Sequence, residues 1–244
     1  MNPPLLQVRG LAKSFGGVHA LDNVSIDVSA GTILGIMGAN GAGKTTLFAL
    51  IAGNSAPSAG EILFRGRSIV GLRPDQICAR GLARTFQIVR PFAGLTVLEN
   101  VTTAALFGSG MHEGHAGAQA AAAGIIRDVG LERRMDSPAG ELTLSGQKRL
   151  EIARAVATGA KLVMLDEVLA GLTAAEIEAM LDMIRRLHAS RGLTLLVIEH
   201  VMRALMHLSH HIVVLHLGRK IAEGEPGAIA GSEEVRRVYF GEAA

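Results

Sequence analysis

The sequence predicts an α/β fold with a mainly parallel sheet, an antiparallel β portion near the N-terminus and a helical insertion. Continuous apolar runs occur at residues 32–37, 162–165 and 193–198, and runs that are apolar on both faces are typical of parallel strands covered by helices on each side. These runs alternate with helical patterns, as in α/β proteins. Residues 8–28 instead show short alternating stretches around a Gly-Gly pair, which indicates antiparallel strands.

Helices are predicted next to these strands. Thr45 to Ala52 follows the first apolar run and reads as a short helix closed by Gly53. A longer helix is expected after Thr173, because Thr173–Glu176 has the form of a capping box and an apolar stripe follows at helical spacing. That stripe consists of Ile177, Met180, Leu181, Ile184 and Leu187. Residues 97–140 are rich in Ala and Gly, so we expect a mobile region of helix and loop with weak side-chain packing.

Composition excludes several classes of protein. The 244 residues carry 24 Lys and Arg against 22 Asp and Glu, with 3% aromatic residues, which argues against nucleic-acid binding through bulk charge or serial base stacking. Cys78 is the single cysteine, so no disulfide forms within the chain and a reducing compartment is expected. No apolar run approaches the ~20 residues of a spanning helix, and the N-terminus lacks a signal-like segment. We therefore expect a cytosolic chain that can dock on a membrane partner.

A glycine-rich segment after the first apolar run matches the phosphate-loop pattern G-x-x-x-x-G-K-[ST]. Glycines let backbone N–H groups converge on phosphate oxygens, and the N-terminus of the following helix favours an anion. The lysine neutralises the β- and γ-phosphates, and the Thr45 hydroxyl can ligate Mg²⁺. The expected nucleotide-binding residues here are Gly38, Ala39, Asn40, Gly41, Ala42, Gly43, Lys44, Thr45 and Thr46. This pattern predicts a nucleotide-binding protein.

A pair of adjacent acids ends the second apolar run. Asp166 and Glu167 directly follow Leu162–Leu165, and an acid at that end of a strand is expected near the phosphate loop of a neighbouring strand. Asp166 can then hold Mg²⁺, usually through water. Glu167 is placed to polarise an attacking water. The alternative is that both acids are a solvated helix cap.

The phosphate loop and the acid pair resemble those of the nucleotide-binding subunits of ABC transporters, and the likeness extends over essentially the whole chain. The resemblance implies a P-loop ABC ATPase core with a mainly parallel sheet, an antiparallel β subdomain at the N-terminus and a helical insertion subdomain. Residues 1–244 would form a single nucleotide-binding domain. Its catalytic core with the β subdomain would comprise residues 1–84 and 145–244, and its helical subdomain residues from about 85 to 144.

Three more residues take roles from this resemblance. Phe15 matches an aromatic residue that stacks on adenine, although taken alone it would more often belong to the core. Gln87 matches a glutamine that contacts Mg²⁺ or the attacking water and responds to the membrane partner; by itself it would be an ordinary surface residue. His200 matches the switch histidine that contacts the γ-phosphate, and its alternative is a hydrogen-bonded core histidine.

The family's signature, L-S-G-G-Q, is matched least well. The text Leu144–Gln147 looks similar, but its serine lies two residues too close to Arg149. An ungapped match places the signature on residues 142–146, and we prefer it because removing two residues would rotate the following helix by roughly 200°. The signature positions are then represented by Thr143, which supplies the hydroxyl, Ser145 and Gly146. In the family this turn closes over the γ-phosphate bound by the opposite subunit.

Two departures and one subfamily likeness complete the comparison. Val168 replaces the proline that commonly follows the acid pair, and Thr173 replaces a common aspartate in the subunit-contact loop. Three segments, residues 149–154, 166–173 and 238–242, resemble the ATPases of branched-chain amino-acid importers. The ATPases of urea or short-amide importers share much of the same sequence.

The resemblance implies an ATPase that uses ATP and Mg²⁺ to power an importer for branched-chain amino acids or similar small polar solutes. Its catalytic residues would be Glu167, His200 and Lys44, with Thr45, Gln87 and Asp166 at the metal. Expected partners are a second ABC ATPase subunit, identical or related, integral membrane permease subunits and, indirectly, a periplasmic solute-binding protein, with no nucleic acid. The chain would lie peripherally on the cytoplasmic side of the inner membrane. The alternatives are a soluble ABC ATPase acting on nucleic acid, an ATP-gated scaffold with little hydrolysis and, more remotely, a kinase.

Overall fold

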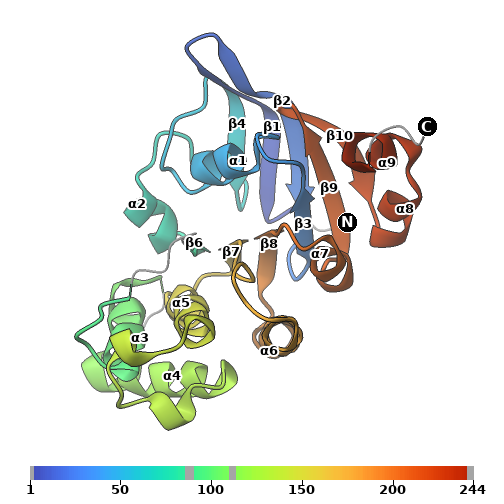
Figure 1. Cartoon of the computed structure of the whole chain (residues 1–244). Coiled ribbons are helices and arrows are strands. Elements are labelled where there is room, and N and C mark those ends of the chain that lie inside the picture. The colour runs from blue at the N-terminus through green and yellow to red at the C-terminus, as the bar shows by residue number, and fades with distance from the viewer. Residues whose placement is uncertain (1–2, 86–90, 110–113, 241–244) are drawn as a thin grey trace. The chain divides into compact units, whose positions relative to one another are not determined.

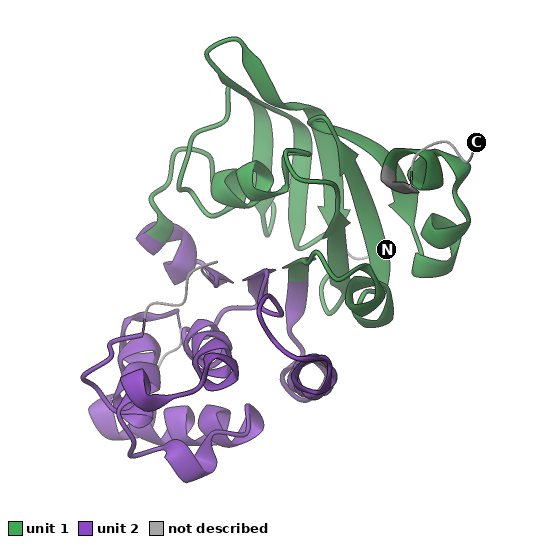
Figure 2. Ribbon diagram, viewed as in Figure 1, with its two compact units in different colours: residues 1–74, 196–244 green, residues 75–195 purple. Residues whose placement is uncertain are grey.

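The computed structural model describes residues 3–85, 91–109 and 114–240. The chain divides into two compact units (Figure 2). Unit 1 consists of residues 1–74 and 196–244, and unit 2 of residues 75–195. Each unit is described below by itself.

The first sheet of unit 1 is antiparallel throughout, with strand order β2-β1-β4-β5 (Figure 1). Its strands are β1 (Leu6–Phe15), β2 (Val18–Val28), β4 (Ala59–Phe64) and β5 (Arg67–Ser68). The long hairpin of β1 and β2 pairs Leu6 with Val28 and Phe15 with Val18, and it turns at Gly16 and Gly17. The antiparallel β portion predicted from residues 8–28 is confirmed.

The other strands of unit 1 are centred on β3 (Ile33–Met37), in which all five residues are buried. β3 pairs in parallel with β9 (His211–His216), and β9 pairs antiparallel with β10 (Arg219–Gly224). β8 (Thr194–Ile198) follows β3 in the strand order, and its last three residues belong to unit 1. The helices of this unit are α1 (Lys44–Ile51), α7 (Met202–Leu208), α8 (Pro226–Gly231) and α9 (Glu233–Phe240). Two of the apolar runs predicted as buried strands, at residues 32–37 and 193–198, therefore form β3 and β8.

Unit 2 is mostly helical. β6 (Leu82–Arg84) pairs in parallel with β7 (Leu162–Asp166), and α2 (Pro74–Ala79) leads into β6 from the unit boundary. The larger helices are α3 (Val97–Phe107), α4 (Gly114–Asp128), α5 (Leu144–Ala157) and α6 (Ala174–Arg191). Short 3₁₀ turns, Glu132–Arg134 and Ala139–Glu141, lie between α4 and α5. No helix within the described residues is both long and apolar enough to cross a membrane.

Two capping boxes begin helices of unit 2. At α6, the Thr173 hydroxyl accepts from the Glu176 N–H at 3.4 Å, and the Glu176 carboxylate accepts from the Thr173 N–H at 2.9 Å. This box was predicted from the sequence and is confirmed. A second box, formed by Thr96 and Glu99 at α3, was not predicted from the sequence. In both boxes, the bonds from the threonine lower the pKa of the glutamate below its usual 4.5.

The capping box of α6 predicts a pH-dependent stability. A carboxyl group whose pKa is lowered by folding contributes stability above its unfolded pKa, and this contribution is lost as the pH falls through the folded pKa. Glu176→Gln should therefore lower the free energy of unfolding at pH 7, and its difference from wild type should shrink as the pH falls below 4.5. Urea unfolding across this pH range measures the difference. Glu178→Gln, on the same helix outside the cap, is the control, and a pH-independent difference for Glu176→Gln would contradict the prediction.

Candidate functional site: a phosphate loop and a buried acid pair

The phosphate loop, residues 38–45, connects β3 to α1 in unit 1. Its tip, residues 39–41, is exposed, whereas Gly38 at its start and Lys44 near its end are buried. α1 begins after Gly43 with no side-chain cap on its first N–H groups. Those N–H groups have no acceptor within the helix, so this end of α1 can donate hydrogen bonds to an anion.

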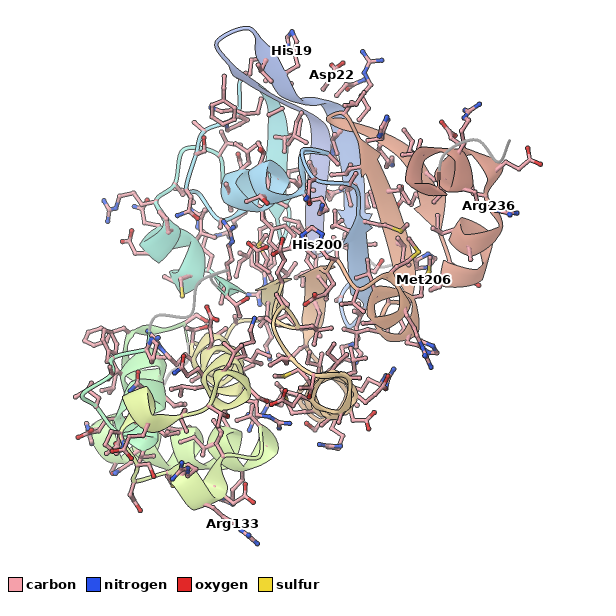
Figure 3. All side chains as sticks on the ribbon, in the orientation of Figure 1. His19, Asp22, Arg133, His200, Met206 and Arg236 are labelled. Carbon is pink, nitrogen blue, oxygen red and sulfur yellow. The ribbon has the colours of Figure 1, made fainter. Side chains whose placement is uncertain are left out.

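Backbone contacts from two distant segments hold the phosphate loop. The Gly218 N–H donates to Ala42 O at 3.1 Å, and the Asp22 N–H donates to Gly218 O at 2.8 Å. Gly218 lies in the turn between β9 and β10, and Asp22, labelled in Figure 3, lies on β2. The loop is thereby fixed through the main chain, which leaves its exposed tip available for a ligand.

Gly43 allows the closest of these approaches. Its φ is +102°, a region that favours glycine. A Cβ added here would lie 2.6 Å from Ala20 O and 2.7 Å from Leu21 Cδ2. Gly41 also has a positive φ, +78°, but a Cβ there would meet nothing within 4 Å. Gly43 is therefore required by both backbone conformation and space, and Gly41 by conformation alone.

Lys44 is oriented by the loop that precedes it. Its side chain is buried, and its ammonium donates to Gly38 O at 2.6 Å and Ala39 O at 3.0 Å. These bonds hold the charge beside the loop rather than in solvent. Thr45 and Thr46 follow in the first turn of α1, with Thr45 exposed and Thr46 half-buried. An exposed hydroxyl at Thr45 suits the expected metal ligand, because Mg²⁺ prefers oxygen donors.

Two more of the predicted site residues lie in unit 1. The Phe15 side chain is 54% exposed, and the Lys13 ammonium lies 4.9 Å from its ring centroid. Phe15 is thus outside the core, and its open ring can stack on a planar base. His200 is also exposed, on the segment that joins β8 to α7 (Figure 3). The alternative of a buried core histidine is therefore wrong for His200.

Asp166 ends β7 in unit 2 and is almost fully buried, with 1% of its side chain exposed. Its Oδ2 accepts from the Arg84 guanidinium at 2.6 Å. Its N–H donates to Thr85 Oγ1 at 3.0 Å. The solvated-cap alternative is therefore wrong for Asp166. A buried carboxylate needs a compensating charge or hydrogen bonds. Arg84 provides a positive charge and a hydrogen bond to Oδ2, one of the two carboxylate oxygens.

The other oxygen of Asp166 fits a metal role. Oδ1 is buried and accepts no hydrogen bond from any described residue. Buried polar atoms are seldom left without a partner, so such an atom calls for an explanation. A carboxylate oxygen is a donor of the kind that Mg²⁺ or its bound water takes. The chemistry of this site is consistent with the metal expected from the sequence.

Glu167 differs from its neighbour in both burial and backbone. It is half-buried, and its φ of +53° places it in the left-handed region, which costs a non-glycine residue roughly 1–2 kcal/mol. The buried Lys148 of α5 donates to Glu167 O at 3.0 Å. This bond fixes the turn after β7, so two consecutive acids are presented in different environments.

Thr143 is the N-cap of α5, which runs from Leu144 to Ala157. Its hydroxyl accepts from the Gly146 N–H at 3.2 Å. Ser145 is half-buried inside the first turn, and Gly146 is buried. Of the two hydroxyls in this segment, that of Thr143 therefore occupies the cap at the opening of the helix. The match of the signature to residues 142–146 stays a prediction.

The predicted site residues fall into two groups. Unit 1 contains Phe15, the phosphate loop and His200, and unit 2 contains Asp166, Glu167 and the start of α5. Gln87 lies outside the described residues. Sequence reasoning missed Arg84, Thr85 and Lys148, which hold the acid pair in place. Arg84 and Thr85 lie three and two residues before Gln87 in the chain, but no local pattern indicated that Arg84 has a partner 82 residues away.

Comparison with known proteins tests the family likeness. A family model described as "ABC transporter" matches residues 21–170. The chain belongs to the ABC transporter family. It is 38% identical, over the full length of both chains, to the high-affinity branched-chain amino acid transport ATP-binding protein LivG of Salmonella typhimurium. It is 36% identical, again over both full lengths, to BraF of Pseudomonas aeruginosa, described in the same terms. The family and the ATPase class predicted from the sequence are confirmed.

Solved structures agree with this assignment. The ADP conformation of MJ1267, an ATP-binding cassette of an ABC transporter, is 30% identical with a TM-score of 0.87, over 99% of this chain and 100% of that one. The cassette MJ0796, solved as a dimer bound to ADP and Pi, matches the fold with a TM-score of 0.78 over 91% of this chain and 98% of that one, at 23% identity. The chain is an ABC-type ATPase with the predicted fold, which has parallel strands, an antiparallel sheet and helices.

The packing of the phosphate loop generates a prediction about its glycines. Gly43→Ala should reduce both the stability and the ATP affinity of this ATPase more than Gly41→Ala, because both substitutions strain the backbone by roughly 1–2 kcal/mol but only Gly43→Ala also clashes with a carbonyl. Urea unfolding and equilibrium dialysis with radiolabelled ATP measure the two effects. Equal losses in the two variants would contradict the expected clash between a Cβ at residue 43 and Ala20 O.

Proposed function

We propose that this ABC ATPase binds ATP with Mg²⁺ and hydrolyses it to drive an importer of branched-chain amino acids or similar small polar solutes. The observation that carries the proposal is the phosphate loop. Three features suit the phosphate groups of a nucleotide. The loop backbone is held by main-chain hydrogen bonds, the Lys44 ammonium is oriented beside the loop, and the first N–H groups of α1 have no side-chain cap. The solute class is supported by full-length similarity to LivG and BraF, whose names state branched-chain amino acid transport.

In the proposed reaction, residues 38–46 bind the phosphates of ATP and Phe15 stacks on adenine. Lys44 and His200 neutralise the negative charge on the transferring phosphoryl group. Glu167 accepts a hydrogen bond from the attacking water and orients it. Bound Mg²⁺ would supply charge neutralisation of the phosphates, held by Thr45, Gln87 and Asp166.

We further propose that the site is completed by a second ABC ATPase subunit. In this arrangement the turn at Thr143, Ser145 and Gly146 contacts the γ-phosphate bound by the other subunit. The N-cap position of Thr143 and the helix start behind it supply N–H groups suited to that anion. Permease subunits in the inner membrane would receive the motion on the cytoplasmic side, and a periplasmic binding protein would deliver the solute.

Binding is the first prediction of this proposal. Lys44→Ala should weaken ATP binding by at least about tenfold, because it removes a charge that contacts the phosphates. Equilibrium dialysis with radiolabelled ATP measures it, and Lys161→Ala, which removes an exposed lysine of unit 2, is the control. Circular dichroism confirms that each variant is folded. Equal ATP binding by Lys44→Ala and wild type would contradict the proposed function.

Hydrolysis is tested separately. Glu167→Gln should keep ATP affinity within about twofold and lower the single-turnover rate by about 10²-fold or more, the usual contribution of a group that activates water. The amide is nearly isosteric, so the turn after β7 is retained, and Glu178→Gln is the control. Equal slow rates for wild type and Glu167→Gln would instead favour an ATP-gated scaffold, the alternative that Val168 and Thr173 raise.

A further inference from the structure

A short, buried ion pair to the acid pair comes from Arg84, a residue with no role in the function proposed above. Its Nη2 lies 2.6 Å from Asp166 Oδ2, and the two side chains are 14% and 1% exposed. Both residues belong to unit 2, at the adjacent ends of the parallel strands β6 and β7. A charge-assisted hydrogen bond this short and this buried is among the stronger polar contacts in proteins.

Thr85 fixes the main chain of the same residue. Its N–H donates to Met164 O at 2.9 Å, and its hydroxyl accepts from the Asp166 N–H at 3.0 Å. The consecutive residues Arg84 and Thr85 therefore hold Asp166 at both the carboxylate and the backbone. Two independent contacts from one short segment leave the carboxylate little freedom to rotate.

The result is an asymmetric carboxylate. Oδ2 is committed to Arg84, and Oδ1 is buried without a hydrogen-bond partner among the described residues. Without Arg84, no hydrogen bond among the described residues would distinguish Oδ1 of Asp166 from Oδ2. The buried negative charge would also lose its counter-charge, which is costly at 1% exposure.

We propose that Arg84 is a positioning residue that locks Asp166 so that Oδ1 is the oxygen presented to the nucleotide-bound metal. The proposal rests on the metal role proposed for Asp166, and it adds to that role a residue that touches neither metal nor nucleotide. Residues that hydrogen-bond a metal-binding carboxylate commonly change metal affinity by roughly 10–100-fold when they are replaced.

The test compares nucleotide affinity with and without the metal. The ratio of the dissociation constant for a non-hydrolysable ATP analogue in EDTA to that in Mg²⁺ reports the metal's contribution. It does not depend on turnover. Arg84→Met should lower this ratio by roughly tenfold and leave the affinity in EDTA within about twofold of wild type. Arg84→Lys, which keeps a charged donor, should restore most of the ratio.

Two further variants complete the set. Asp166→Asn should lower the ratio at least as much as Arg84→Met, and the double variant should be no worse than Asp166→Asn alone, because both changes act through one carboxylate. Arg185→Met is the matched control, since it removes an Arg–Asp hydrogen bond from the exposed face of α6. Mn²⁺ binding followed by electron paramagnetic resonance is an independent readout of the same site.

The outcomes separate this inference from the proposed function. An unchanged ratio in Arg84→Met with a lowered ratio in Asp166→Asn overturns the inference and leaves the metal role of Asp166 standing. Equal losses of affinity in EDTA and in Mg²⁺ mean that Arg84 only supports the fold, which also overturns it. An unchanged ratio in Asp166→Asn overturns the metal role itself. If Arg84→Met does not fold, Arg84→Gln replaces it with the same expected loss and the same overturning result.

Discussion

The close approach of three backbone segments at the phosphate loop is the constraint on which the rest of unit 1 depends. Main-chain hydrogen bonds link Asp22 of β2 to Gly218 and Gly218 to Ala42, and Ala20 O leaves no space for a side chain at Gly43. The segments come from both ends of the chain, so the loop acquires its shape only when the antiparallel hairpin and the β9–β10 turn are folded. A phosphate-binding backbone is useful only if it is rigid before the ligand arrives, because preorganised donors need no reorganisation on binding.

The two acids that end β7, Asp166 and Glu167, are held in place by different contacts. Asp166 is held by charge and burial, and Glu167 by a left-handed turn whose carbonyl accepts from Lys148. Their environments differ because β7 ends at Asp166. Asp166 is still buried with the strand, whereas Glu167 follows the strand and is half-buried. The two carboxylates therefore have separate environments, which suits the separate roles proposed for them, holding a metal and orienting water. The buried Lys148 also links helix α5 to the turn that carries Glu167.

Much of this was predictable because the signals are local. The phosphate loop, the buried strand runs, the acid pair and the capping box at Thr173 are each contained in fewer than ten consecutive residues. The contacts that complete them are not. Arg84 reaches Asp166 across 82 residues, and Gly43 lacks space because of a carbonyl in β2. The short strand β6 was also missed, since three residues of strand leave little periodic pattern to read, and so was the capping box at Thr96.

The surroundings of Val168 and Thr173, the two departures from the family pattern, explain how the fold accepts them. Val168 is 2% exposed, so an apolar side chain at this position is explained by core packing. Thr173 caps α6, and threonine and aspartate both serve as N-cap residues. Replacing the common aspartate by threonine therefore keeps the start of the helix and removes one negative charge. Any effect on the subunit contact would then act through charge rather than through a change of fold, and charge effects at an exposed residue weaken as salt is added.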